Sequence, residues 1–279
     1  MPVTVVCPNC DARLTAPEAV LGKKVKCKIC KATFFVPTMD HDVVSDAAGG
    51  GKIIAHAPRT KEFEVAVGDE ESIEAISDHV ERHYGKIEMV YHEVISDLVH
   101  IDVHWVAPSG VRPYHTLVTS GMSERPMRAP EGAEAFRYGE MMICLPPTWR
   151  MSMEDWNDER WYWPVRWLKI MARFPHEYDT WLAPSHTVPN EDPPQRFASN
   201  TKLCCSLVMP PLIAPEGFSE LKISDEKTIR FYSLVPIYRE EMEFKLKRGF
   251  DPLVELLDKN KVTELLDIGR RNVCKKGWW

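Results

Sequence analysis

The sequence predicts an α+β fold: a body with a mainly antiparallel sheet flanked by helices, preceded by a small cysteine-rich module. Two Cys-x-x-Cys pairs lie near the start, strand-like alternation fills residues 87–122, and helical patterns lie on both sides of that stretch. The chain has 279 residues, of which 44% are hydrophobic and 27% charged. It is therefore long enough to bury a sizeable core and has the composition of an ordinary globular protein.

The first module is defined by Cys7 and Cys10, followed after sixteen residues by Cys27 and Cys30. This spacing is typical of a four-thiolate zinc site. Four thiolates suit a closed, structural site, and so short a segment has too little core to fold without such a staple. Redox dithiols are the alternative, but no thioredoxin-like βαβ pattern surrounds the pairs. We therefore expect residues 1–37 to form a small zinc ribbon with a structural Zn²⁺ on these cysteines.

The ribbon also resembles a prokaryotic zinc-ribbon family found at protein N-termini, through Gly22-Lys-Lys-Val before the second cysteine pair. It departs from that family at Lys31, where glycine is usual. Residues 38–66 contain Gly49-Gly-Gly51, few large apolar residues and no clean period. They are expected to be a flexible linker between the ribbon and a body at 67–272.

Charge is distributed unevenly between the two parts. The net charge is −6, and residues 1–36 hold six basic and two acidic residues, so this segment is +4 and the remainder −10. The basic ribbon is a weak indication of nucleic-acid binding, and the acidic body favours a basic protein partner. There is no secretory signal pattern and no apolar run of the length that crosses a bilayer, so we expect a cytoplasmic protein without a membrane partner.

The body is predicted to begin with a helix after Asp69, in which Ile73, Ile76 and Val80 share a face. His79 and His83 are expected on the solvated face of this helix, because no further ligand completes a zincin motif. The later predicted elements are three strands within 87–122, a strand at 136–145, a helix around 163–171 closed by Pro175, strands at 202–209 and 228–237, and helices at 238–249 and from Asp251.

One candidate catalytic constellation is His100-x-Asp102-x-His104, three residues that alternation places on the same face of a strand. Two imidazoles and a carboxylate suit a divalent metal, and His92 and His115 on neighbouring strands could join them. A polar outer face opposite Val99, Ile101, Val103 and Trp105 explains the same pattern without chemistry. We favour that interpretation. Because no nucleophile elbow, P-loop or dinucleotide motif occurs, we expect no enzyme activity.

Several separated motifs together resemble the Suppressor of fused (SUFU) domain, over roughly residues 70–245. They are Asp102-Val-His-Trp, Tyr114-His-Thr-Leu-Val-Thr-Ser-Gly-Met-Ser, Glu140-Met-Met-Ile-Cys-Leu-Pro, Trp163-Pro-Val-Arg-Trp-Leu-Lys and Thr180-Trp-Leu. The resemblance implies an α/β sheet domain that binds a protein. Animal members clamp a peptide of a Hedgehog-pathway transcription factor as an added strand, and bacterial members are associated with toxin immunity. This chain departs from the animal form, because it has no second lobe after residue 250 and carries a zinc ribbon in front.

The sequence thus predicts a bacterial-type SUFU-like protein, a non-enzymatic protein-binding module that serves as an immunity protein and neutralises a toxin by occlusion. Two alternatives from other classes stay open. One is a metal-dependent hydrolase that uses His100, Asp102 and His104. The other is an adaptor whose zinc ribbon binds nucleic acid.

Overall fold

The structure, a computed structural model of the chain, describes residues 2–7, 9–10, 12–17, 20, 23–36, 43–57, 59, 61–93 and 95–275. The chain divides into two compact units, Met1–Thr60 and Lys61–Trp279. Among the described residues, no helix is both long and apolar enough to cross a membrane.

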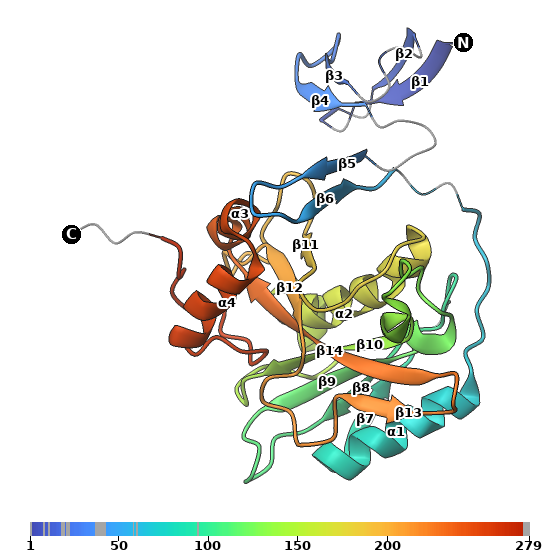
Figure 1. The fold of residues 1–279 in the computed structure, drawn as a ribbon, viewed down its shortest axis with the longest axis vertical. Helices are drawn as coiled ribbons and strands as arrows, with labels where there is room; N and C mark the ends of the chain where they lie inside the picture. Colours follow the sequence, from blue (N-terminus) through green and yellow to red (C-terminus); the bar gives the residue numbers. More distant parts are fainter. Residues whose placement is uncertain are drawn as a thin grey trace. The chain divides into compact units, whose positions relative to one another are not determined.

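The first unit is built from antiparallel hairpins (Figure 1). Strands β1 (Pro2–Val6) and β2 (Arg13–Pro17) form one pair, and β3 (Lys24–Lys26) and β4 (Thr33–Phe35) form the next. Its small core joins Val5, Phe34 and Val36 to two of the cysteines. Such a core is too small to hold the segment together without a further cross-link.

The predicted linker differs from the structure in one respect. Strands β5 (Val43–Asp46) and β6 (Lys52–Ala55) form a hairpin inside it, joined by a turn at Gly50 with φ 86°. The glycines that suggested flexibility therefore lie in a tight turn, which needs positive φ. The division into ribbon, linker and body remains a prediction.

The body is organised around an eight-stranded sheet with the order β11-β12-β14-β10-β9-β8-β7, and β13 pairs with β14 off this path. All neighbouring strands are antiparallel except β10 and β14. The strands are β7 (Ile87–Tyr91), β8 (Asp102–Val106), β9 (His115–Ser120), β10 (Gly139–Leu145), β11 (Thr187–Pro189), β12 (Cys205–Met209), β13 (Glu220–Lys222) and β14 (Thr228–Ile237). The α+β prediction with a mainly antiparallel sheet is confirmed.

Helices cover both faces of this sheet (Figure 1). Helix α2 (Glu159–Glu177) packs Trp163, Leu168 and Met171 against one face. Helix α1 (Glu70–Tyr84) packs Ile76 and Val80 against the other. Helices α3 (Arg239–Arg248) and α4 (Phe250–Lys259) follow β14, and α4 packs on β12 and β14. Three short 3₁₀ turns occupy Met122–Glu124, Glu134–Phe136 and Asp155–Asn157.

The prediction that His79 lies on the solvated face of α1 is wrong. His79 is buried, and its Nε2 lies 2.9 Å from the carbonyl oxygen of Phe218. The segment that covers it is far away in sequence, so the helical pattern alone could not reveal the contact.

Helix α2 is longer than its sequence pattern predicts. It begins after the N-cap Asp158 and contains both Pro164 and Pro175, so neither residue marks an end. Proline lacks an N–H and leaves the carbonyl four residues earlier without its usual partner. For Pro164 that carbonyl belongs to Arg160, and the side-chain amide of Asn200 donates to it at 3.1 Å. This contact explains how the helix continues through a proline.

Candidate metal centre and binding edge

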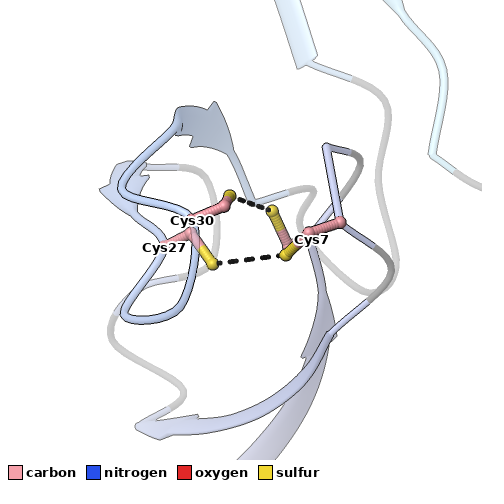
Figure 2. Close-up of side chains that lie close together, drawn as sticks. Cys7, Cys27 and Cys30 are labelled. Carbon is pink, nitrogen blue, oxygen red and sulfur yellow. Dashed lines mark hydrogen bonds between the residues drawn. The ribbon is translucent and has the colours of Figure 1, made fainter.

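The four cysteines of the first unit come together as the spacing predicts. Their donor atoms all lie within 4.8 Å of one another. Cys7 Sγ lies 3.6 Å from Cys30 Sγ, and Cys10 Sγ lies 3.8 Å from Cys27 Sγ. Figure 2 shows how Cys7, Cys27 and Cys30 turn their sulfurs toward one another. This arrangement can hold a metal ion with four thiolate ligands.

In the turn formed by the second Cys-x-x-Cys pair, called the second knuckle, backbone N–H groups lower the pKa of Cys27 and Cys30 and so favour their thiolates. The N–H of Ala32, helped by Asn9, lowers the pKa of Cys30 to about 6. The pKa of Cys10 is instead raised to about 12: the N–H of Ala12 lowers it, but burial and the neighbouring thiols outweigh that effect. Four thiolates cannot share so small a space without a compensating charge, which a bound cation would supply.

The unusual Lys31 lies in this same knuckle. Its φ is 63°, in the left-handed region that glycine enters most easily. Its N–H still donates to the carbonyl of Cys27 at 3.1 Å, so the turn keeps its hydrogen bond. The departure from the zinc-ribbon pattern thus places a lysine at a position where the backbone requires positive φ.

The second predicted constellation is not assembled in the predicted way. Regular strand β8 begins only at Asp102, so His100 lies outside it, and His100 Nε2 reaches Asp102 Oδ1 at 3.0 Å. His104 is buried and instead contacts Ser120 Oγ through Nε2 at 2.9 Å. His115 accepts a hydrogen bond from Trp105 Nε1 at 3.0 Å and does not join the cluster. The triad His100, Asp102 and His104 therefore does not form one site.

The prediction that the polar face of β8 is exposed to solvent is also wrong. Asp102 and His104 are both buried, because α1 and the segment around Phe218 cover the face that the sequence pattern left open. Of the two histidines predicted on neighbouring strands, His92 does join Asp102: its Nδ1 lies 2.9 Å from Asp102 Oδ2. His92 follows the end of β7, directly across from Asp102 on the neighbouring strand.

The most family-like run, Tyr114–Ser123, is a structural device built around the buried Glu140. Its carboxylate accepts hydrogen bonds from the hydroxyls of Thr119 and Ser123, both at 2.6 Å, and from the N–H groups of Ser123 and Gly121, at 2.9 and 3.0 Å. Burial raises the pKa of Glu140, and these four donors oppose the rise. Gly121 has φ 106°, and a Cβ there would lie 1.7 Å from the carbonyl oxygen of His100. These contacts fix the turn that follows β9.

An exposed apolar edge lies just before α1. Residues 64–66 run antiparallel to residues 96–98: the N–H of Leu98 donates to the carbonyl of Glu64 at 2.8 Å, and that of Ala66 to Ser96 at 3.3 Å. Phe63, Val65 and Val67 are 59%, 70% and 86% exposed. In the described part of the chain, the backbone groups of these three residues have no hydrogen-bond partner. Sequence reasoning missed this edge, although the alternation of 63, 65 and 67 was the available signal.

Contacts to the body hold this edge in place. Lys61 Nζ donates to the carbonyl of His176 and to Asp179 Oδ1, both at 2.7 Å. Glu64 pairs with Arg125 at 2.5 Å, and its N–H donates to Asp97 Oδ1 at 3.0 Å. The edge is thus ordered before any partner arrives.

Together these features define a class: an α+β scaffold with an open strand edge, preceded by a four-cysteine cluster that can hold a metal ion. The sequence model described as "Suppressor of fused protein (SUFU)" matches residues 97–271. The body of this chain belongs to the Suppressor of fused family, as the sequence motifs predicted. No curated protein matches the chain in sequence.

A bacterial SUFU homologue and a Sufu–Fu complex share this fold. A SUFU homologue from Neisseria gonorrhoeae FA 1090 is 16% identical, with a TM-score of 0.56; the match covers 75% of this chain and 100% of the homologue. A Sufu–Fu complex is 14% identical with a TM-score of 0.52, covering 72% and 92%. Drosophila Suppressor of Fused gives 14% identity and a TM-score of 0.48, covering 78% and 52%.

Proposed function

We propose that this chain is a non-enzymatic protein-binding module that adds an extended segment of a partner protein to the edge at residues 63–67. The observation that carries this proposal is the unpaired, apolar edge of Phe63, Val65 and Val67. In strand addition, backbone hydrogen bonds give affinity and alternate side chains give specificity. Because the edge is already ordered, its binding costs little further conformational entropy.

The two outer edges of the large sheet are less suited to this role. Strand β7 has an irregular register between Ile87 and Met89, and it carries the charged Glu88. Strand β11 is three residues long and ends at Pro189. Bulges, charges, short length and proline are the devices by which proteins protect sheet edges from pairing. The edge at 63–67 carries Glu64, but that carboxylate is paired with Arg125, and the exposed positions Phe63, Val65 and Val67 are apolar.

The chemistry of the partner follows from charge. Residues 61–72 hold five acidic residues and one lysine, which gives a local charge of −4 beside the edge. A partner segment with apolar residues at alternate positions and basic residues between them would complement this surface, and opposite charge speeds association. A basic toxin such as a nuclease has this character. The finer part of the proposal is therefore immunity: the chain would occlude such a toxin in the cytoplasm.

We further propose that the ion in the four-cysteine site is a structural Zn²⁺ on Cys7, Cys10, Cys27 and Cys30. The sulfur donor set and its closed geometry support zinc over harder cations such as Mg²⁺ or Ca²⁺. Four protein ligands leave no position for a reacting water, so this site is proposed to stabilise the ribbon and not to catalyse.

The proposal is tested by co-purifying the full chain with proteins encoded beside its gene and titrating any partner calorimetrically. Val67→Lys should weaken binding by tenfold or more, because the side chain loses its apolar contact in the added sheet. Val111→Lys is the matched control, since Val111 is also 86% exposed but lies in the turn between β8 and β9. Equal affinities of the two variants for the partner would refute the edge at 63–67 as the binding site. If no protein encoded beside the gene bound the chain, the immunity role would be refuted.

A further inference from the structure

We propose that His92, His100 and Asp102 form a second metal site, which takes a divalent transition ion of the Zn²⁺ type. The site lies in the body, it is separate from the four-cysteine site, and the inference does not depend on the proposed partner. One ligand atom from each residue lies within 4.8 Å of the others. Two imidazoles and one carboxylate are a donor set that zinc accepts, with a fourth position left for water or another ligand.

The three side chains come from different segments that the fold brings together. Asp102 opens β8, His92 follows β7 on the neighbouring strand, and His100 lies in the approach to β8. Asp102 presents one carboxylate oxygen to each ring: Oδ2 lies 2.9 Å from His92 Nδ1, and Oδ1 lies 3.0 Å from His100 Nε2. The three donors therefore converge without any rearrangement of the strands.

A second layer of contacts orients the donors. Ser96 Oγ lies 2.6 Å from His100 Nδ1, and the N–H of Glu93 donates to Asp102 Oδ1 at 3.3 Å. Histidine ligands usually direct their second nitrogen to such a partner, which fixes the tautomer and the ring.

Ser96 can hydrogen-bond to His100 both with and without a metal ion in the site. Without a metal, His100 Nε2–H donates to Asp102 and the Ser96 hydroxyl donates to Nδ1. With a metal on Nε2, Nδ1–H donates to the Ser96 oxygen. A hydroxyl can play both roles because it is a donor and an acceptor.

Exposure defines the route by which an ion reaches the site. The side chains of Asp102 and His100 are 2% and 18% exposed, whereas that of His92 is 68% exposed. An ion would enter from the His92 side, and the fourth coordination position would face solvent there.

Neighbouring cations leave the carboxylate of Asp102 available. Arg173 pairs with Glu93 at 2.5 Å. Lys169 of α2 lies in the field of both Glu93 and Asp102, but within the described residues it makes no hydrogen bond to either. Asp102 thus keeps its two imidazole neighbours as its side-chain partners.

The test is equilibrium dialysis of the full chain against buffered Zn²⁺, with the metal counted by mass spectrometry. Wild type should bind two ions per chain, and His92→Asn should bind one. His83→Asn is the matched control, because His83 is also partly exposed and no carboxylate among the described residues pairs with it; this variant should keep two ions. Ser96→Ala should bind the second ion about tenfold more weakly, as expected for loss of an orienting contact.

The proposal would be overturned if His92→Asn bound as many ions as wild type. Circular dichroism of each variant shows whether it is folded, so that loss of metal is not confused with unfolding. A cobalt-loaded chain gives an independent readout. Replacing the ribbon cysteines with serine should abolish the thiolate-to-cobalt absorption and keep the weaker bands of a nitrogen- and oxygen-ligated ion. Absence of those bands would also overturn the proposal.

Discussion

Replacing Glu140 with alanine should be among the most destabilising substitutions in the body. The carboxylate accepts four hydrogen bonds that fix the turn after β9. Without it, two backbone N–H groups and two hydroxyls lose their acceptor inside the core. Each buried polar group left unpaired costs about 1–3 kcal/mol, so Glu140→Ala should lower the free energy of unfolding by about 4 kcal/mol or more. That is a large part of the stability of a typical domain, which is about 5–15 kcal/mol.

The matched variant Glu140→Gln separates hydrogen bonding from charge. Its carbonyl oxygen can keep the three donors on Oε1. Its amide can donate to Thr119 Oγ1, which already accepts from the N–H of Met141 at 2.8 Å and has a second lone pair. Only the hydroxyl of Thr119 loses its acceptor, so the cost should be about 1–2 kcal/mol.

Urea unfolding of the full chain, followed by the fluorescence of the buried tryptophans, measures both variants. The alanine variant should be destabilised by at least about 2 kcal/mol more than the glutamine variant. Equal losses for the two, or a loss below about 1 kcal/mol for alanine, would show that the four contacts do not stabilise the fold as argued.

Three further predictions concern the backbone, pH and metal. Gly121→Ala should lower the free energy of unfolding in urea by more than about 3 kcal/mol, because φ is 106° and the added Cβ would collide with the carbonyl of His100. The control Gly132→Ala, with φ 85° and no atom within 4 Å of the added Cβ, should lower it by only about 1 kcal/mol. Burial, with the charge of Lys245, lowers the pKa of His186 to about 4, so the unfolded state binds more protons than the folded state between pH 6.5 and 4. The free energy of unfolding should therefore fall by up to about 3 kcal/mol as the pH is lowered from 6.5 to 4. In His186→Phe, this contribution to the pH dependence should be absent. Chelation should unfold the ribbon while the body still unfolds in a separate thermal transition of its own; loss of both structures in one step would contradict two independent units.

Local patterns predicted the parts of the fold that depend on near neighbours. The cysteine spacing correctly predicted that four sulfurs lie together, and the alternation within 87–122 correctly predicted three adjacent strands, which are antiparallel. Trp163 lies in the core, as its helical spacing against a predicted sheet indicated. These results need only the period of a strand or helix and the geometry of a knuckle.

Other features depended on contacts between distant segments. His104 was expected in water but is buried, because α1 and residues near Phe218 cover that face. His104 lies in β8 with Asp102 but contacts Ser120 on the neighbouring strand, whereas His92, one of the two histidines predicted as additional ligands, contacts Asp102. Pro164 continues a helix because Asn200, thirty-six residues later, caps the carbonyl it releases. No local pattern reveals the contacts that Phe218 and Asn200 make with these segments.

The central claim, strand addition at residues 63–67, is tested most directly by amide hydrogen exchange of the full chain with and without its co-purified partner. The N–H of Val65 has no partner in the described part of the free chain, so it should exchange rapidly alone and be protected in the complex. Unchanged exchange at Val65, with new protection at β7 or β11 instead, would contradict the account and place the partner on another edge.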